Sequence, residues 1–224
     1  MSRTLEDTHL LTVFGRRNSF NVQKVLWFLD EIKRDYSHVD LGGSFGGLDD
    51  PMYRLMNPHG TVPFIDDGGT IVWESHAILR YLAATYGADQ FWHDDPKSRA
   101  QVDQWMDWSQ TALQPAFLGG IFWGYYRTPA AQRDISAINI RVAECARYFT
   151  LLDDMLAQQQ FIIGDRLSLA DIPIGTHLFR YFGVDIERPP IANVERWYRR
   201  LQERQGYSQH VMMPFDDLFG RLAP

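Results

Sequence analysis

The sequence predicts a small mixed α/β unit followed by an all-helical unit. Short runs with strand character alternate with helical spacings up to residue 86, whereas only helical spacings follow residue 96. A stretch with three aspartates, residues 88–95, separates the two patterns. We therefore expect one domain at 1–87, a linker at 88–95 and a second domain at 96–224.

In the first unit, the order strand, helix, strand, helix, strand, strand, helix fits a small mixed sheet with helices packed on it. Runs rich in strand formers predict strands at residues 10–14, 36–41, 62–65 and 70–73. Helical spacings begin at Val22 and recur at 51–56 and 77–86. Residues 66–69 suit a hairpin turn, and the glycine-rich residues 42–47 suit a surface loop.

The second unit shows no convincing strand. Helical spacings predict helices at 96–118, 130–157, 168–181 and 190–205. We expect Gly119, Gly120 and Gly124 to break the first of these helices.

Ser168 and Asp171 have the spacing of a capping box, with Leu167 and Ile172 as its hydrophobic staple. This box is expected to start a buried helix. Replacing Ser168 by Ala is expected to cost about 0.5–2 kcal/mol of stability without direct loss of chemistry.

Composition and charge exclude several classes of protein. Hydrophobic residues make up 45% and charged residues 22%, enough for a buried core. The net charge of −6 disfavours binding to nucleic acid or to an anionic membrane. The N-terminus lacks the apolar run of a signal peptide or anchor, and a single cysteine precludes an intrachain disulfide. We expect a cytoplasmic protein, and because no histidines show metal-ligand spacing, we expect no metal site.

The segment 57–63, Asn-Pro-His-Gly-Thr-Val-Pro, ends where a strand opens. A cis bond between Val62 and Pro63 would turn the backbone N–H and C=O of Val62 outward, where a peptide could pair with them as an added strand. A plain turn before a strand is the alternative.

In the segment 73–78, a strand runs directly into a helix. Glu74 and Ser75 fall at the helix N-terminus, where unpaired N–H groups bind carboxylates. Glu74 could accept from an ammonium group, so the pair suits the head of an α-amino acid. The alternative is that Ser75 only caps its own helix.

Residues 16–22 join the first strand to the first helix, and they include Ser19 and Asn21. Small polar donors at a helix N-terminus can stabilise a thiolate. The alternative is that Ser19 is a helix cap.

Taken together, residues 19–25 (Ser-Phe-Asn-Val-Gln-Lys-Val), 57–63 and 74–78 (Glu-Ser-His-Ala-Ile) resemble the cytosolic glutathione transferase family, most closely its bacterial theta-, beta- and nu-like members. The resemblance spans nearly the whole chain. It implies a thioredoxin-like βαβ-αββα domain with a mixed four-stranded sheet, then an all-α bundle domain that forms the electrophile pocket. It also implies a homodimer.

The resemblance further implies that glutathione is the co-substrate. Ser19 would donate to its thiolate, with Asn21 as partner or substitute. Val62 would pair with the cysteinyl part beside a cis Pro63, and Glu74 and Ser75 would hold the γ-glutamyl head.

Two departures from the family pattern stand out. The loop 42–51 lacks the His or Lys that many members use on the glycyl end. We therefore expect either a lower affinity for glutathione or that Arg16, Arg17 or His59 takes over that role. No cysteine lies near Ser19, which disfavours a mixed-disulfide mechanism. Cys145 is expected to be an inert packed thiol.

The family places its electrophile pocket in the aromatic part of the helical domain. Candidates here are Trp108, Phe117, Phe122, Trp123 and Tyr126. For each of these residues, core or dimer packing is the alternative.

The expected activity is conjugation of glutathione to a small apolar electrophile, with glutathione-dependent reduction of peroxides or disulfides as a related reaction of the same site. A non-catalytic binding or regulatory module is the rival, because a fold does not fix a function.

Overall fold

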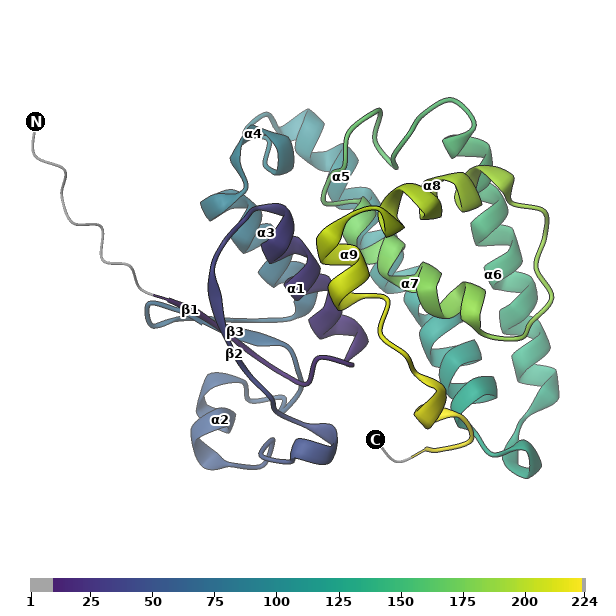
Figure 1. Ribbon diagram of the computed structural model, residues 1–224, viewed down its shortest axis with the longest axis horizontal. Helices are drawn as coiled ribbons and strands as arrows, with labels where there is room; N and C mark the ends of the chain where they lie inside the picture. Colours follow the sequence, from purple (N-terminus) through teal and green to yellow (C-terminus); the bar gives the residue numbers. More distant parts are fainter. Residues whose placement is uncertain (1–9, 223–224) are drawn as a thin grey trace, which may run out of the picture.

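The computed structural model describes residues 10–222; the charged N-terminal residues 1–9 and residues 223–224 lie outside the described part. A four-stranded sheet and its helices form the first half, and a helical bundle forms the second (Figure 1). The first half contains β1 (Leu11–Phe14), α1 (Phe20–Glu31), β2 (Tyr36–Val39), η1 (Gly43–Phe45), α2 (Pro51–Met56), β3 (Phe64–Asp67), β4 (Thr70–Trp73) and α3 (Ser75–Tyr86).

The strand order is β2-β1-β3-β4, with β1 parallel to β2 and the other two pairs antiparallel. This is the mixed sheet that the order of sequence patterns predicts. Helices α1 and α3 contact each other, whereas α2 lies apart from them, below the sheet in the view of Figure 1. Strand β3 begins two residues later than predicted, because Val62 and Pro63 precede the ladder.

The second half contains α4 (Ala88–Phe91), α5 (Pro96–Trp108), η2 (Ser109–Leu113), η3 (Pro115–Arg127), η4 (Ala130–Gln132), α6 (Ile135–Leu156), α7 (Asp171–Gly183), α8 (Ala192–Gln202), α9 (Gln205–His210) and η5 (Asp216–Leu218). The stretch expected to be a linker therefore carries the short helix α4. The helix expected at 190–205 is α8, which ends at Gln202, and a further short helix, α9, begins at Gln205.

The expectation that glycines end the helix after α5 is wrong. Helix η2 and helix η3 continue it as π-helix through Gly119, Gly120 and Gly124. Gly120 has a packing reason: a Cβ there would lie 2.4 Å from Cγ of Arg141 on α6. The missing side chain lets η3 and α6 pack closely.

The predicted capping box is present in altered form. Helix α7 begins at Asp171, whose Oδ2 accepts hydrogen bonds from the backbone N–H and the hydroxyl of Ser168, both at 2.8 Å. Its Oδ1 accepts from the N–H of Ile162 at 2.9 Å. Burial nevertheless raises the pKa of Asp171 to about 6. The Ser168 hydroxyl itself accepts a hydrogen bond from the N–H of Ala170, whereas a capping box would have it accept from the N–H of Asp171.

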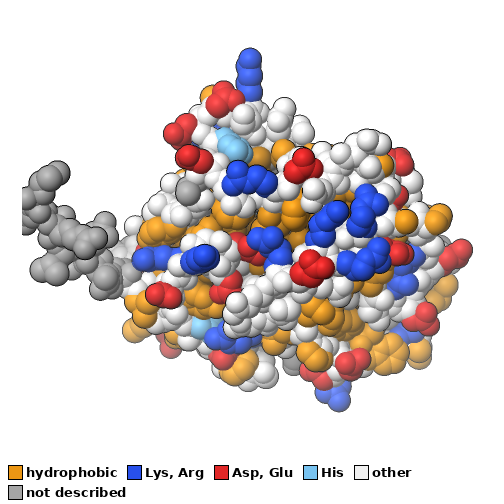
Figure 2. Space-filling view, turned by 45° about the horizontal axis from the view of Figure 1, so that its top comes forward, with side chains coloured by type: hydrophobic (Ala, Val, Ile, Leu, Met, Phe, Trp, Pro, Cys, Tyr) orange, Lys and Arg blue, Asp and Glu red, His pale blue; other side chains and the backbone are white. Residues whose placement is uncertain are grey.

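The core joins both halves. Helix α7 is buried along almost its whole length and contacts α1, η2, η3 and α8. Cys145 on α6 is 1% exposed, and burial raises the pKa of its thiol to about 12, in agreement with an inert packed thiol. On the face shown in Figure 2, acidic and basic side chains are interspersed. Within residues 10–222, no helix is both long and apolar enough to cross a membrane.

Candidate active site

The sheet register brings three of the segments singled out above to one edge. Phe14, the last residue of β1, pairs with Phe64, the first residue of β3. Phe64 in turn pairs with Trp73, the last residue of β4. The chain that leaves β1, the chain that enters β3 and the chain that leaves β4 therefore begin at adjacent positions.

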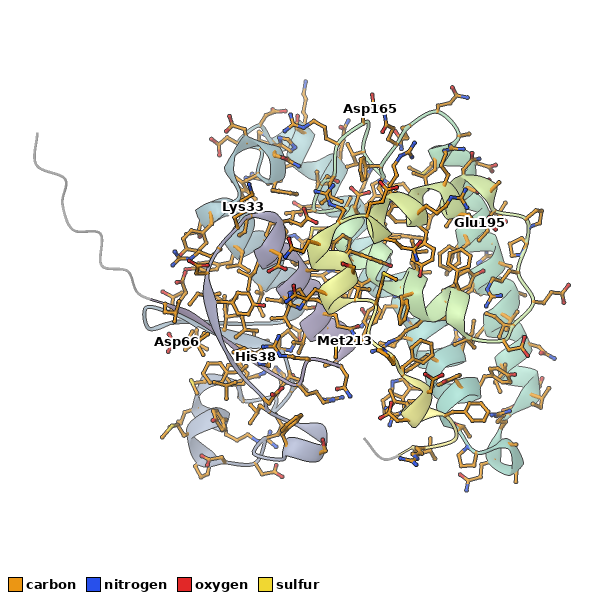
Figure 3. All side chains as sticks on the ribbon, viewed as in Figure 1. Lys33, His38, Asp66, Asp165, Glu195 and Met213 are labelled. Carbon is orange, nitrogen blue, oxygen red and sulfur yellow. The ribbon has the colours of Figure 1, made fainter. Side chains whose placement is uncertain are left out.

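Gly15 allows the first two of these segments to approach closely. Its φ is +143°, and a Cβ there would lie 2.6 Å from Val22 Cγ2 and 2.9 Å from Val62 Cβ. The backbone of Gly15 is held on both sides. Its N–H donates to the carbonyl of Val39, and its carbonyl accepts from Nε2 of His38, labelled in Figure 3, at 2.7 Å. Only glycine fits this junction without displacing a neighbour.

A cavity of about 340 Å³ opens at this edge, between the first domain and helices η3 and α7. From the first domain, Ser19, Asn21 and Val62 line it. From the helical domain, Phe122 and Trp123 line it together with Leu118, Arg127 and Arg180. Six residues that the sequence singles out thus share one cavity: Arg16, Ser19, Asn21, Val62, Phe122 and Trp123.

Ser19 directly precedes α1 and is 8% exposed. Its side chain makes no capping hydrogen bond to the helix, although its carbonyl accepts from the N–H of Gln23 at 2.9 Å. The hydroxyl is therefore not used for the structural role that the sequence left open. It is available to donate to a group in the cavity.

Asn21, in the first turn of α1, is oriented by a buried lysine. Nζ of Lys24 donates to Oδ1 of Asn21 at 3.0 Å. When Lys24 is protonated it only donates, so the amide oxygen of Asn21 then faces the lysine, and the Nδ2 donors are turned away from it. Asn21 is thereby presented to the cavity as a donor.

Lys24 is fully buried and has two further partners. Its ammonium donates to Oε1 of Gln114 at 2.7 Å and lies 3.2 Å from Nε2 of His76. Burial lowers the pKa of Lys24 to about 7, partly opposed by the charge of Glu74. The lysine thus joins α1, α3 and the polypeptide after η2 beneath the cavity.

Val62 carries backbone groups that the sheet does not use. The Val62–Pro63 peptide bond is cis, as expected. Among the described residues, no hydrogen bond to the N–H or the C=O of Val62 is present. Both groups can therefore pair with an extended ligand in the cavity.

Glu74 and Ser75 lie at the start of α3, beside this segment but outside the cavity lining. Glu74 is exposed and has φ +69°, a conformation uncommon for residues other than glycine. Ser75 is 5% exposed and is the first residue of α3, with Glu74 at the N-cap position, so the alternative that Ser75 caps α3 is not observed.

Three other predicted glutathione contacts lie outside the cavity lining. Pro63 is buried behind Val62. His59 is exposed, with its ring 5.0 Å from that of Trp73. Arg17 is exposed beside Tyr36, to which it donates a side-chain hydrogen bond.

Three of the five aromatic candidates pack elsewhere. Phe117 is fully buried against the rings of His177 and Tyr181. Trp108 stacks edge-on with Trp105 and Tyr148, and the hydroxyl of Tyr126 donates to the carbonyl of Phe215. Phe117 and Tyr126 belong to the core, one of the alternatives that the sequence left open, and Trp108 is half-buried against it.

The π-helical form of η3 explains which of its side chains line the cavity. In a π-helix, residues four and five positions apart share a face. Leu118, Phe122, Trp123 and Arg127 have these spacings, and all four line the cavity. An α-helix would keep the pairs four residues apart on one face but would separate the pairs five residues apart.

Sequence reasoning named Arg16 as a glutathione contact but missed the two arginines on the helical side of this cavity. Arg127 and Arg180 are 3% and 5% exposed and join Arg16 in the lining. Burial lowers the pKa of each of the three guanidinium groups, and that of Arg180 falls to about 9 with Arg127 and Arg16 as further causes. The available signal was an arginine among the apolar and aromatic residues of the last turns of α7, where Arg180 lies between Phe179 and Tyr181.

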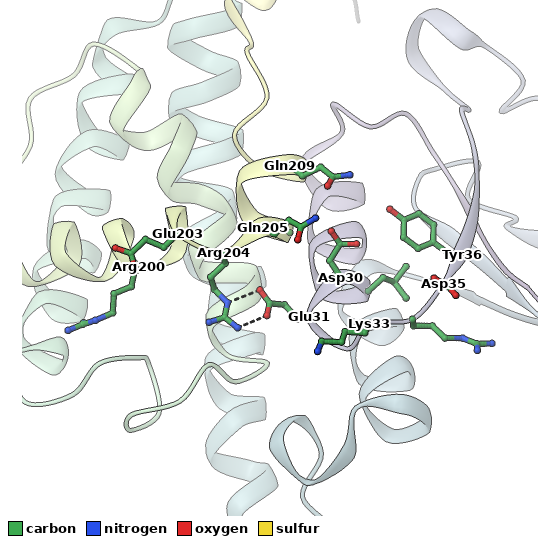
Figure 4. Close-up of a pocket in the computed structure, with 13 residues that line it drawn as sticks. Asp30, Glu31, Lys33, Asp35, Tyr36, Arg200, Glu203, Arg204, Gln205 and Gln209 are labelled. Carbon is green, nitrogen blue, oxygen red and sulfur yellow. Dashed lines mark hydrogen bonds and ion pairs between the residues drawn. The ribbon is translucent and has the colours of Figure 1, made fainter.

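A larger groove of about 730 Å³ lies at the far end of α1 (Figure 4). Its most buried charge, Glu31, accepts two hydrogen bonds from Arg204, at 2.7 and 2.5 Å. This pair ties α1 to the start of α9 and so serves the contact between domains. Within residues 10–222, no group of three or more potential metal ligands occurs.

Comparison with known proteins agrees with the resemblance seen in the sequence. Residues 13–90 match the family model "Glutathione S-transferase, N-terminal domain", and residues 129–200 match "Glutathione S-transferase, C-terminal domain". The chain is 41% identical to glutathione S-transferase GstB of Escherichia coli over 92% of this chain and 99% of the relative.

Solved structures give the same result. The theta class glutathione S-transferase of Xanthomonas axonopodis pv. citri with glutathione bound is 40% identical, with a TM-score of 0.85, covering 92% of this chain and 99% of that one. Its apo form has a TM-score of 0.78 at 36% identity, covering 91% and 97%. The chain therefore belongs to the glutathione S-transferase family.

Proposed function

We propose that this glutathione S-transferase binds glutathione at the edge of the sheet and activates it as a thiolate, with Ser19 and Asn21 as the donors to sulfur. One observation carries the proposal. The uncommitted hydroxyl of Ser19, the amide of Asn21 and the unpaired backbone of Val62 border one cavity. Donors fixed in advance around a developing anion stabilise it without reorganisation.

The required energy is modest. A free thiol has a pKa of about 8.5, and lowering it by about 2 units corresponds to about 2.7 kcal/mol of preference for the anion. A hydrogen bond to a charged group contributes about 1.5–3 kcal/mol, and a helix N-terminus adds a few tenths to about 1 kcal/mol. Two side-chain donors at the start of α1 are therefore sufficient.

The rest of the tripeptide follows the sheet edge. Val62 would pair with the cysteinyl backbone, and the start of α3, with Glu74 and Ser75, would receive the γ-glutamyl head. Arg16 is the best-placed group for the glycyl carboxylate. It lines the cavity and lies against the loop after β2, since a Cβ at Gly43 would be 2.8 Å from Arg16 Cδ.

In the reaction, the thiolate sulfur attacks an electrophilic carbon of a second substrate held against Leu118 and Phe122. Binding both reactants in one cavity replaces a bimolecular encounter by a positioned one. The family resemblance further supports a cytoplasmic homodimer in which each subunit carries this site.

The test combines binding with turnover. Wild type should be retained on immobilised glutathione and should conjugate 1-chloro-2,4-dinitrobenzene. The double variant Ser19→Ala, Asn21→Ala should still bind glutathione but lose at least about 100-fold in kcat/KM, since each lost donor corresponds to about 1.5–3 kcal/mol. Ser136→Ala, an exposed hydroxyl on α6, is the matched control. Absence of both retention and turnover in wild type would favour the non-catalytic module instead.

A further inference from the structure

The wall of the cavity is cationic. Arg16, Arg127 and Arg180 all line it, and none of the described lining residues is Asp or Glu. A pocket built only for an apolar electrophile has no use for three buried or half-buried guanidinium groups, because desolvating a charge is costly. The charge needs a counterpart in the bound state.

Arg180 is a buried cation without an acidic partner among the described residues. It is 5% exposed, and its described hydrogen bonds go to neutral oxygens, the carbonyl of Asn18 at 2.8 Å and Oε1 of Gln23 at 3.4 Å. Both bonds use Nη2. The guanidinium lies 4.7 Å from the ring of Phe122, and among the described residues it forms no ion pair.

The electrostatics of this group agree with its geometry. Burial and the nearby charges of Arg127 and Arg16 lower the pKa of Arg180 to about 9. At neutral pH the group therefore remains a cation, in a place where the protein disfavours cations. An anion beside it would relieve both the desolvation and the repulsion.

Arg127 is placed to share such an anion, although it has partners of its own. Its Nε donates to the carbonyl of Arg221 at 2.9 Å, and its guanidinium stacks on Trp123 at 3.9 Å from the ring centroid. Asp217 on η5 offsets part of its charge. Arg180 therefore carries most of the uncompensated charge on the helical side of the cavity.

Resting on the function proposed above, we propose that the second substrate is itself an anion: a small electrophile with a carboxylate or sulfonate that Arg180 binds, while its apolar part lies on Leu118 and Phe122. Arg180 comes from α7, on the helical side of the cavity where the electrophile would lie. Arg16, beside the loop after β2, remains for the glycyl carboxylate of glutathione.

A matched pair of electrophiles tests this assignment. In 4-chloro-3,5-dinitrobenzoate and its methyl ester, the thiolate attacks the carbon that bears chlorine, a C–S bond forms, the C–Cl bond breaks, and chloride leaves. The carboxylate keeps its bonds, but it withdraws electrons from the ring less than the ester does, so each kcat/KM is divided by the rate constant of the uncatalysed reaction with glutathione before the two are compared. We expect wild type to prefer the carboxylate by at least about tenfold in kcat/KM, the effect of one charge-assisted hydrogen bond. A wild type that prefers the ester, or shows no preference, overturns the proposal.

Variants assign the preference to the residue. Arg180→Met should reduce the ratio of the two kcat/KM values about tenfold, Arg180→Lys should retain most of it, and Arg147→Met, an exposed arginine on α6, should leave it unchanged. If Arg180→Met instead raises the KM for glutathione and leaves the ratio unchanged, the guanidinium serves glutathione and the proposal fails. If Arg180→Met does not fold, a wild type without preference for the carboxylate still overturns the proposal.

Binding of the finished products separates this proposal from the conjugation activity. The glutathione conjugates of the acid and of the ester can be prepared chemically and titrated into wild type by calorimetry. Tighter binding of the acid conjugate without any turnover would support the anion site and reject the thiolate mechanism. Equal binding of both conjugates together with turnover of both electrophiles would reject the anion site and support the thiolate mechanism.

Discussion

The ammonium group of Lys24 donates a 3.0 Å hydrogen bond to the side-chain oxygen of Asn21, one helical turn before it on α1. The lysine is fully buried, and Gln114 on the helical side is its shortest contact, at 2.7 Å. The orientation of a side chain in the cavity thus depends on a contact between the two domains. Lys24 does not line the cavity, so under the proposed function it is a positioning residue.

Replacing Lys24 by Met should release Asn21 from this orientation. A freed amide can turn its oxygen towards the thiolate, so we expect kcat to fall about tenfold, the loss of one hydrogen bond to an anion, with a smaller change in the KM for glutathione. The pKa of bound glutathione, measured by thiolate absorbance, should rise in parallel. Lys97→Met, at the exposed start of α5, is the control. A variant with an unchanged thiol pKa would exclude the positioning role.

The same lysine should make stability depend on pH. Burial lowers its pKa from 10.5 to about 7, so between these values the unfolded chain binds the proton and the folded chain does not. The free energy of unfolding therefore rises with pH across this window, by up to about 1.4 kcal/mol per pH unit. Urea denaturation at pH 7, 8 and 9, from the lower limit of this window to about its middle, should show wild type gaining stability relative to Lys24→Met. A constant difference between the two proteins contradicts this.

An aspartate at position 21 should separate folding from chemistry. Asn21→Asp keeps the shape and gives Lys24 an ionic partner, so thermal stability should be maintained or raised. The new carboxylate would border the cavity where the thiolate forms, and like charges at short range disfavour each other. We expect a larger loss of kcat/KM than in Asn21→Ala. Should Asn21→Asp retain more activity than Asn21→Ala, Asn21 does not act on the sulfur.

Local patterns explain why most of the first domain could be predicted. Strands and helices there alternate in type, and short loops leave few ways to connect them, so residues 10–86 led to the observed mixed sheet. The hairpin of β3 and β4 also follows from residues next to each other in the sequence. The three site segments adjoin these strands, and the register Phe14–Phe64–Trp73 fixes where they meet.

The helical side of the cavity could not be predicted in the same way. A π-helical η3 changes which side chains share a face, and no residue type marks that change. Arg180 lies 162 positions after Asn18, to whose carbonyl it donates. Long-range contacts of this kind depend on how the two domains pack, which no local period encodes.

Two adjacent glycines in η3 provide the last prediction, because they differ only in what lies opposite. A Cβ at Gly119 would meet nothing within 4 Å, whereas a Cβ at Gly120 would lie 2.4 Å from Cγ and 2.8 Å from Cβ of Arg141. The Cβ of Arg141 is fixed by the backbone of α6, so side-chain rotation cannot remove the second clash.

Gly120→Ala should therefore push η3 away from α6 and cost about 1–3 kcal/mol, the usual penalty of overpacking. Gly119→Ala should stabilise the protein by about 0.5–1 kcal/mol, because alanine restricts the unfolded chain and favours the helix. Chemical denaturation of both variants measures the two effects under identical conditions. Equal stabilities for the two variants would mean that η3 and α6 do not approach as closely as Gly120 and Arg141 indicate, and the cavity wall carried by η3 would then be placed differently.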